Sequence, residues 1–348
     1  MKINLKVGFF LLLFLGTEAA FATNLTALIN RNLAQADSLQ LAYKYQNALT
    51  LLDTTLQLYE QEIADTLKAS IYYQQASIFY YKHQKDEALA KAKLAVSIQR
   101  ANFPEKHSKT AISAYLIGLI YQRFDEREKA KQAILEAVNY TPSSDANLYY
   151  RHRRLGYLYA DSGKDTLAVI HFQKALRGFA ENSLESIRIS YWLATSLGEI
   201  QQIHQARNYF SATKAICKAE RKRFPKERRY LTALHATLLR EATFYTDIGQ
   251  AKKALQLYQE LIQVKDQLTL TQKDLLWTFS VQKTELYFDY TKVYREAGNV
   301  FLDYKFFPST EEITGCDCSE GLASTYEKIA QLYDRLGDYP KSLSYLQK

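Results

Sequence analysis

One stretch of the chain shows most clearly how apolar and polar positions alternate. Leu155–Tyr159 is an apolar and aromatic segment, and Gly163 follows it as a turn residue. After that turn, Ala168, Phe172 and Ala175 recur at the spacing of one helix face. The pattern predicts two helices joined by a tight turn, because small residues let the helices approach and glycine suits the turn.

The same arrangement recurs along much of the chain. The positions that define its clearest copies are Gly118, Tyr121, Ala130, Gly156, Tyr159, Gly163, Ala168, Phe172, Ala175 and Ala254. The small residue of each expected second helix is an alanine, at Ala48, Ala88, Ala130, Ala168, Ala206 and Ala254. These alanines are 40, 42, 38, 38 and 48 residues apart, so the period is regular but not constant.

The pattern resembles that of the tetratricopeptide repeat family. It consists of a small residue, an aromatic residue three positions later, a turn and then Ala-x3-Phe. The resemblance covers about residues 40–265 and part of 322–348. It implies an all-α fold, a superhelical array of antiparallel helix hairpins of the α-solenoid type. The family period is about 34 residues, so longer helices or longer inter-repeat loops are expected here. Other helical repeats, whose periods reach about 40 to 47 residues, are the alternative.

Residues 284–321 break this rhythm. Phe306–Thr310 contains a proline, and Thr314–Gly321 contains two glycines, so both stretches are typical of a loop. We therefore interpret residues 23–283 as tetratricopeptide-like repeats and 284–321 as a divergent repeat with a loop insertion. Residues 322–348 then form a partial terminal repeat.

The N-terminus has the pattern of an export signal. Lys2 and Lys6 precede the apolar run Val7–Gly16, and Ala20–Ala22 fits the rule for a cleavage site. We predict a signal peptide over residues 1–22 and an exported, periplasmic or secreted protein that begins at Thr23. An uncleaved anchor and a buried N-terminal helix are the alternatives. No other apolar run of about 18 residues occurs, so no membrane span is expected in the mature chain.

Composition supports helices and adds a modest positive charge. Only 12 Gly and 5 Pro occur in 348 residues, which disfavours a turn-rich β fold. The net charge of +8 would become +7 without residues 1–22, and it could favour acidic partners or simply keep the protein soluble. Eight basic residues gather over 214–229. Export argues against nucleic acid as their partner, and a solvated helix end or an acidic partner is expected instead.

We find no sequence pattern for catalysis or metal binding. The chain has no phosphate-binding glycine loop, no His-Glu-x-x-His and no nucleophile elbow, so we expect neither an enzyme nor a cofactor. The six histidines include no pair at i, i+4 and are expected to be surface or packing residues. Cys316, Cys318 and Cys217 are expected to form a loop disulfide or to remain free thiols; metal and redox roles are the alternatives.

In the family that the chain resembles, the first helices of the hairpins line a concave groove, and partners usually lie there. Aligning those helices by their small residues predicts a partner-binding stripe of five tyrosines and one arginine: Tyr73, Tyr80, Tyr115, Arg153, Tyr157 and Tyr191. The alternative is that these rings pack within the array. We therefore expect an interaction scaffold for a protein or peptide partner. The end at Lys348 suggests an alternative, the sensory ectodomain of a longer membrane signalling protein such as a histidine kinase or regulator.

Overall fold

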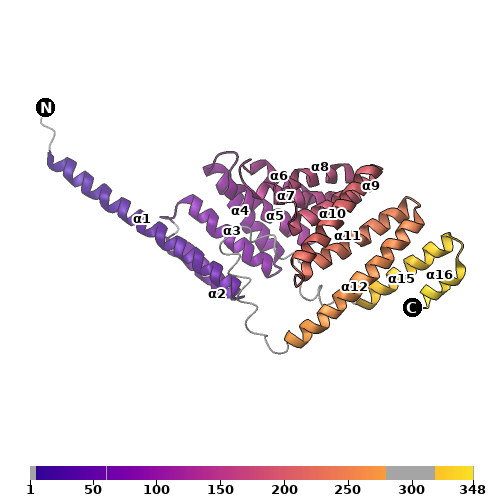
Figure 1. The fold of residues 1–348 in the computed structure, drawn as a ribbon. Coiled ribbons are helices and arrows are strands. Elements are labelled where there is room, and N and C mark those ends of the chain that lie inside the picture. The colour runs from indigo at the N-terminus through magenta and orange to yellow at the C-terminus, as the bar shows by residue number, and fades with distance from the viewer. Residues whose placement is uncertain (1–4, 60, 280–317, 348) are drawn as a thin grey trace. The chain divides into compact units, whose positions relative to one another are not determined.

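The computed structural model describes residues 5–59, 61–279 and 318–347, and all regular structure within them is helical. The helices follow one another along the chain (Figure 1) as α1 (Leu5–Leu41), α2 (Tyr45–Tyr59), α3 (Asp65–Tyr81), α4 (Lys85–Asn102), α5 (Ser108–Arg123), α6 (Arg127–Tyr140), α7 (Asn147–Ala160), α8 (Asp165–Leu176), α9 (Leu184–Glu199), α10 (Ile203–Arg223), α11 (Arg228–Asp247), α12 (Ala251–Phe279), α15 (Cys318–Arg335) and α16 (Tyr339–Leu346). They pair into hairpins, which confirms the predicted fold class.

The chain forms two compact units, residues 1–151 and 152–348, which we call unit 1 and unit 2. In unit 1, α1 packs on α2, α3 on α4, and α5 on α6. In unit 2, α9 packs on α10, α11 on α12, and α15 on α16. The part of α7 after Arg151 faces α8. Within each unit, neighbouring hairpins also touch, as α4 touches α5 and α10 touches α11.

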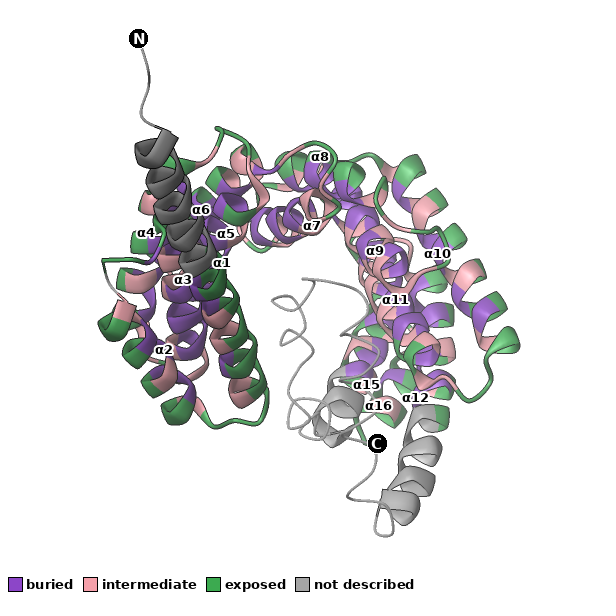
Figure 2. Ribbon diagram, turned by 90° about the vertical axis from the view of Figure 1, so that its left-hand side faces the viewer, coloured by how far each residue is buried: buried purple, intermediate pink, exposed green. Residues whose placement is uncertain are grey.

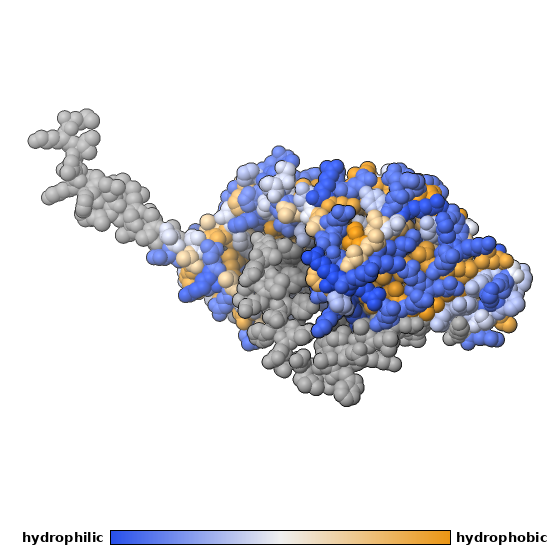
Figure 3. All heavy atoms as spheres, in the orientation of Figure 1, coloured by the Kyte–Doolittle hydropathy of each residue, from blue (hydrophilic) through white to orange (hydrophobic). Residues whose placement is uncertain are grey.

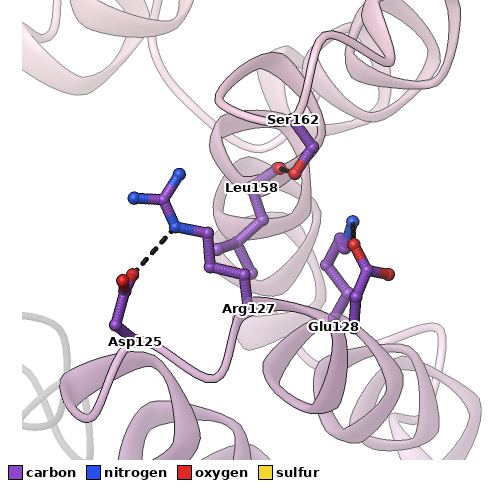
Figure 4. A network of polar contacts seen from close by, with 6 residues as sticks. Asp125, Arg127, Glu128, Leu158 and Ser162 are labelled. Atoms are coloured by element: carbon purple, nitrogen blue, oxygen red, sulfur yellow. Dashed lines mark hydrogen bonds and ion pairs between the residues drawn. The ribbon is translucent and has the colours of Figure 1, made fainter.

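The turns between paired helices share one backbone geometry. In the described residues, seven such turns each hold one residue in the left-handed region, with φ from 57° to 77°: Tyr43, His83, Asp125, Gly163, Gln201, Gly249 and Gly337. The amide after that residue donates to the carbonyl five positions before it, over 2.8–3.0 Å. This is the Schellman motif, which satisfies carbonyls at the end of the first helix. At one turn of unit 1, Arg127 Nε also donates to Asp125 Oδ1 over 2.9 Å (Figure 4).

The alanines recognised in the sequence have a fixed place relative to these turns. In six of the seven turns an alanine with 0% exposure stands five residues after the left-handed residue, and Ser342 takes that place in the last. The variable spacing of the repeats therefore arises outside the turns. Helix length accounts for much of it, since α8 has 12 residues whereas α10 has 21 and α11 has 20.

Glycines on the first helices allow the paired helices to approach closely. A Cβ on Gly118 would lie 2.4 Å from Cγ1 of Ile134 on α6, and a Cβ on Gly156 would lie 2.5 Å from the ring of Phe172 on α8. Both Ile134 and Phe172 have 0% exposure. Figure 2 shows the buried residues along the facing sides of paired helices and the exposed residues away from them.

Two predicted segment boundaries can be compared with the helices. Helix α15 begins at Cys318, so residues 318–321 are helical and not part of the predicted loop; Ser319 and Glu320 suit the first turn of a helix. Residues 280–317, with the rest of that loop, lie outside the described residues. Helix α1 runs through the predicted signal segment to Leu41, and removal of that segment stays a prediction. Among the described helices, none is both long and apolar enough to cross a membrane.

Candidate functional site

Three of the predicted partner-binding tyrosines belong to unit 1. Tyr80 on α3 and Tyr115 on α5 are buried, with 3% and 6% exposure, while Tyr73 on α3 is partly exposed. The guanidinium carbon of Arg123 lies 4.8 Å from the ring centroid of Tyr80, and that of Arg151 lies 5.7 Å from the ring centroid of Tyr115. These rings therefore pack within unit 1 in this conformation, and their role in partner binding stays a prediction.

The same face of unit 1 also holds buried amides that bond to carboxylates. Gln74 Nε2 donates to Asp37 Oδ1 over 2.6 Å, and Gln75 Nε2 donates to Asp53 Oδ1 over 2.6 Å. Gln75 has 0% exposure and Gln74 has 5%. Burial raises the pKa of Asp37 above its ordinary value, and the hydrogen bond from Gln74 partly opposes that rise. These bonds tie α3 to α1 and α2.

The other three predicted residues lie in unit 2 and are partly exposed: Arg153 and Tyr157 on α7, and Tyr191 on α9. The ring of Tyr157 contacts two other aromatic rings edge-on, with centroid distances of 5.3 Å to Phe172 and 5.5 Å to Trp192. Burial raises the pKa of Tyr157 to about 12, while the positive charge of Arg153 opposes that shift. Tyr157 therefore contacts both the core of the α7–α8 hairpin and the neighbouring helix α9.

Two residues that the sequence analysis did not select complete this face. The guanidinium carbon of Arg240 on α11 lies 3.4 Å from the ring centroid of Trp192 on α9 and 5.5 Å from that of Tyr191. Burial lowers the pKa of Arg240, and the neighbouring tyrosines Tyr191 and Tyr157 oppose this. Both Trp192 and Arg240 stand two positions before the small residue of their helix, an offset that could have identified them. We call Tyr157, Tyr191, Trp192 and Arg240 the arginine–aromatic face.

A buried histidine pair lies between α7 and α8. His152 Nδ1 and His171 Nδ1 are 3.0 Å apart, and the ring of Tyr159 stacks on His171 with a centroid distance of 5.3 Å. Both imidazoles are at most 9% exposed, and burial lowers the pKa of each to about 4. The pair therefore packs the α7–α8 hairpin in its neutral form. No group of three or more metal-ligating side chains occurs in the described part of the chain.

The three cysteines can be placed only in part. Cys217 on α10 is a buried free thiol, and burial raises its pKa to about 12. Such a group is a poor nucleophile at neutral pH, because the thiolate is the reactive form. Cys316 lies outside the described residues and Cys318 begins α15, so the predicted loop disulfide stays a prediction.

The basic cluster over residues 214–229 is partly neutralised. Ion pairs join Lys214 Nζ to Glu241 Oε2 over 2.6 Å and Lys218 Nζ to Glu260 Oε1 over 2.8 Å. Arg221, Lys222 and Arg223 occupy the last turn of α10, where positive side chains interact favourably with the helix dipole. This arrangement favours the solvated helix end over a separate acidic-partner site.

A cavity of 860 Å³ lies elsewhere, in unit 1. Helices α4, α5 and α6 line it, and Lys93, Arg100 and Lys129 contribute positive charge. None of the six predicted partner-binding residues lines this cavity. Exposed apolar side chains include Leu167 and Ile170, one turn apart on α8. Figure 3 shows hydrophobic residues scattered among hydrophilic ones on the face in view.

Comparison with known proteins agrees with this architecture. Residues 111–144, which hold α5 and α6, match the tetratricopeptide repeat family. The C-terminal part of a TPR repeat-containing protein from Cytophaga hutchinsonii is 15% identical, with a TM-score of 0.54, and the likeness covers 90% of this chain and 92% of that one. The apo form of RapI is 13% identical, with a TM-score of 0.51, covering 92% and 95%. By sequence, the chain matches no curated protein.

At these identities the likeness to solved structures concerns the fold. The fold and the seven similar hairpin turns are those of tetratricopeptide repeat proteins, and the repeat itself is matched over residues 111–144. Proteins of this class are helical scaffolds that usually bind other proteins and do not catalyse reactions.

Proposed function

We propose that this tetratricopeptide repeat protein is a non-catalytic scaffold that works outside the cytoplasm. In this proposal it binds a protein or peptide segment in the concave groove, on the faces of its first helices that point away from their hairpin partners. The family suggests a protein partner. The export pattern of residues 1–22, with a cleavage site before Thr23, supports the location.

The arginine–aromatic face of unit 2 is the observation that carries the proposal. It combines side chains of three first helices, α7, α9 and α11, and all of them are partly exposed. Tyr, Trp and Arg are the residue types most enriched among the residues that dominate binding energies. Their mutual contacts hold the side chains in place before a partner arrives, so binding sacrifices less conformational entropy.

Site-specific crosslinking in the native cell tests this proposal. A photo-crosslinking phenylalanine analogue replaces Tyr191 in one strain and Ile170, which is 42% exposed on α8, in a control strain. We expect one specific protein adduct from position 191 and none from position 170. The adduct should be found outside the cytoplasm, on a chain that begins at Thr23. Equal adducts from both positions, or an adduct confined to the cytoplasm, would contradict the proposal.

A further inference from the structure

Arg240 is a cation that lies against aromatic rings and not against a carboxylate. Its guanidinium stacks on Trp192 at 3.4 Å, and no ion pair within 4.0 Å joins it to a carboxylate of the described residues. A guanidinium that stacks on a ring presents its N–H groups at its edge, where they can donate to a further group. Arg240 is partly exposed, so that edge is accessible to a ligand.

The acidic residue next to Arg240 in the sequence is already engaged. Glu241 is 4% exposed, and its Oε2 forms an ion pair with Lys214 Nζ on α10 over 2.6 Å. Asp161, directly after α7, is the carboxylate that acts on Arg240 electrostatically. Within the described residues, Arg240 therefore has a carboxylate influence but no ion pair within 4.0 Å.

Other arginines also lie near the arginine–aromatic face. Burial raises the pKa of Tyr157 and Tyr191; the positive charge of Arg188 opposes both rises, and that of Arg153 opposes the rise at Tyr157. Arginines of α7, α9 and α11 thus create a shared positive potential around two tyrosines. Such a potential attracts an anionic group, and the partly desolvated surroundings strengthen its attraction.

We propose that the arginine–aromatic face docks an acidic peptide segment of the partner, with an Asp or Glu carboxylate paired to the guanidinium of Arg240. The inference rests on the proposed function, because it gives the chemistry of the partner that the first helices bind. A carboxylate matches the two parallel N–H groups at the edge of a guanidinium, and the apolar part of the segment matches the rings. A nucleic acid backbone would instead call for a longer row of cations.

Tryptophan fluorescence of the full chain can test this inference directly. The chain contains two tryptophans, so a Trp277→Phe background leaves Trp192 as the sole reporter beside Arg240. The probe is an end-capped octapeptide of alternating Ala and Glu, and the matched peptide has Gln in place of Glu. We expect the acidic peptide to change the fluorescence of Trp192 in a saturable manner and the Gln peptide to have no such effect.

Two substitutions separate the specific contact from general charge. Arg240→Gln should weaken binding of the acidic peptide about tenfold, as expected for loss of a charge-assisted hydrogen bond. Arg207→Gln is the matched control, because Arg207 also lies over a tyrosine ring, Tyr245 at 5.6 Å, but on the second helix α10. It should leave the affinity unchanged within about twofold. Arg240→Lys, which keeps the charge but not the paired N–H groups, should give an intermediate loss.

Circular dichroism of each variant establishes that the helices are intact. Equal binding of the two peptides, equal losses from Arg207→Gln and Arg240→Gln, or equally strong competition by a single-stranded oligonucleotide would each overturn the inference. Its failure is distinguishable from failure of the proposed function. If position 191 captures a partner in cells while the acidic peptide does not bind, the scaffold function stands and the acidic partner is wrong.

Discussion

The first helices of the two units carry different chemistry on corresponding faces. In unit 1, α3 uses the buried amides of Gln74 and Gln75, which donate to Asp37 and Asp53 over 2.6 Å each. In unit 2, α9 and α11 meet through a guanidinium stacked on an indole, at Trp192 and Arg240. The first arrangement pairs amide donors with carboxylate acceptors inside the protein. The second places a cation on an aromatic ring, with no ion pair to a carboxylate of the described residues.

This difference suggests that stability and binding are divided between the two faces. An amide buried with its acceptor is costly to remove, because the partner group loses its hydrogen bond. A partly exposed arginine on an aromatic ring contributes little to folding, yet it can provide much of the energy of a complex. We therefore expect substitutions in the unit 1 face to affect unfolding and those in the unit 2 face to affect partner capture.

The largest expected effect is a loss of folding stability in unit 2 at acidic pH. The neutral pair His152 and His171 has folded pKa values of about 4, below the ordinary value of 6.5. Its contribution to stability is thus complete above about pH 6.5 and is lost as the pH falls toward 4. Linkage sets the full loss on the order of 3 kcal/mol for each histidine. Hydrogen exchange at pH 7 and pH 5 should show α8 losing protection.

Unit 1 provides the internal contrast for this experiment. Burial raises the pKa of Asp37, so protonation there becomes more favourable in the folded state and acidification relieves a penalty. Helices α1 and α3 should therefore retain protection better than α8. His152→Gln combined with His171→Gln should remove the sensitivity of α8 above pH 5, and equal losses in both units would refute the assignment.

A smaller effect is expected from removing one polar partner in each unit. Gln75→Ala should lower the free energy of unfolding by about 1–3 kcal/mol, because a fully buried amide and its bond to Asp53 are lost. Arg240→Ala should cost no more than about 1 kcal/mol, the worth of a partly exposed cation–π contact. Urea unfolding followed by circular dichroism measures both. The reverse order of the two costs would break the proposed division between the faces.

The smallest effect should be shared by the units, because their turns have the same geometry. Gly163→Ala in unit 2 should destabilise by about 1 kcal/mol, since φ is +66° there and a Cβ is unfavourable in that region. Asp125→Gly in unit 1, where φ is +58°, should be neutral or stabilising by a few tenths of a kcal/mol. Thermal unfolding distinguishes the two signs. Destabilisation by both would mean that the turns are not equivalent.

What the sequence predicted well depends on short-range geometry. A turn residue and an alanine five positions later belong to one local motif. Gly163 and Ala168 therefore predict a hairpin even when the rest of the fold is not known. The contact of Trp192 with Arg240 joins residues 48 positions apart, and His152 meets His171 only after the hairpin closes. Such pairs depend on rotamers and helix packing, which periodicity does not specify. The burial of Tyr80 and Tyr115 has the same origin.

The fixed interval between each left-handed turn residue and the following alanine limits where this chain can gain or lose residues. One residue inserted in that interval would rotate the second helix by about 100°, since a helix has about 3.6 residues per turn. The alanine would then no longer lie at the contact between the two paired helices. Residues added at the ends of the helices away from the turn leave that contact unchanged, as the different lengths of α8 and α10 illustrate. Tags, reporter domains and natural insertions should therefore be tolerated between hairpins and rejected within them.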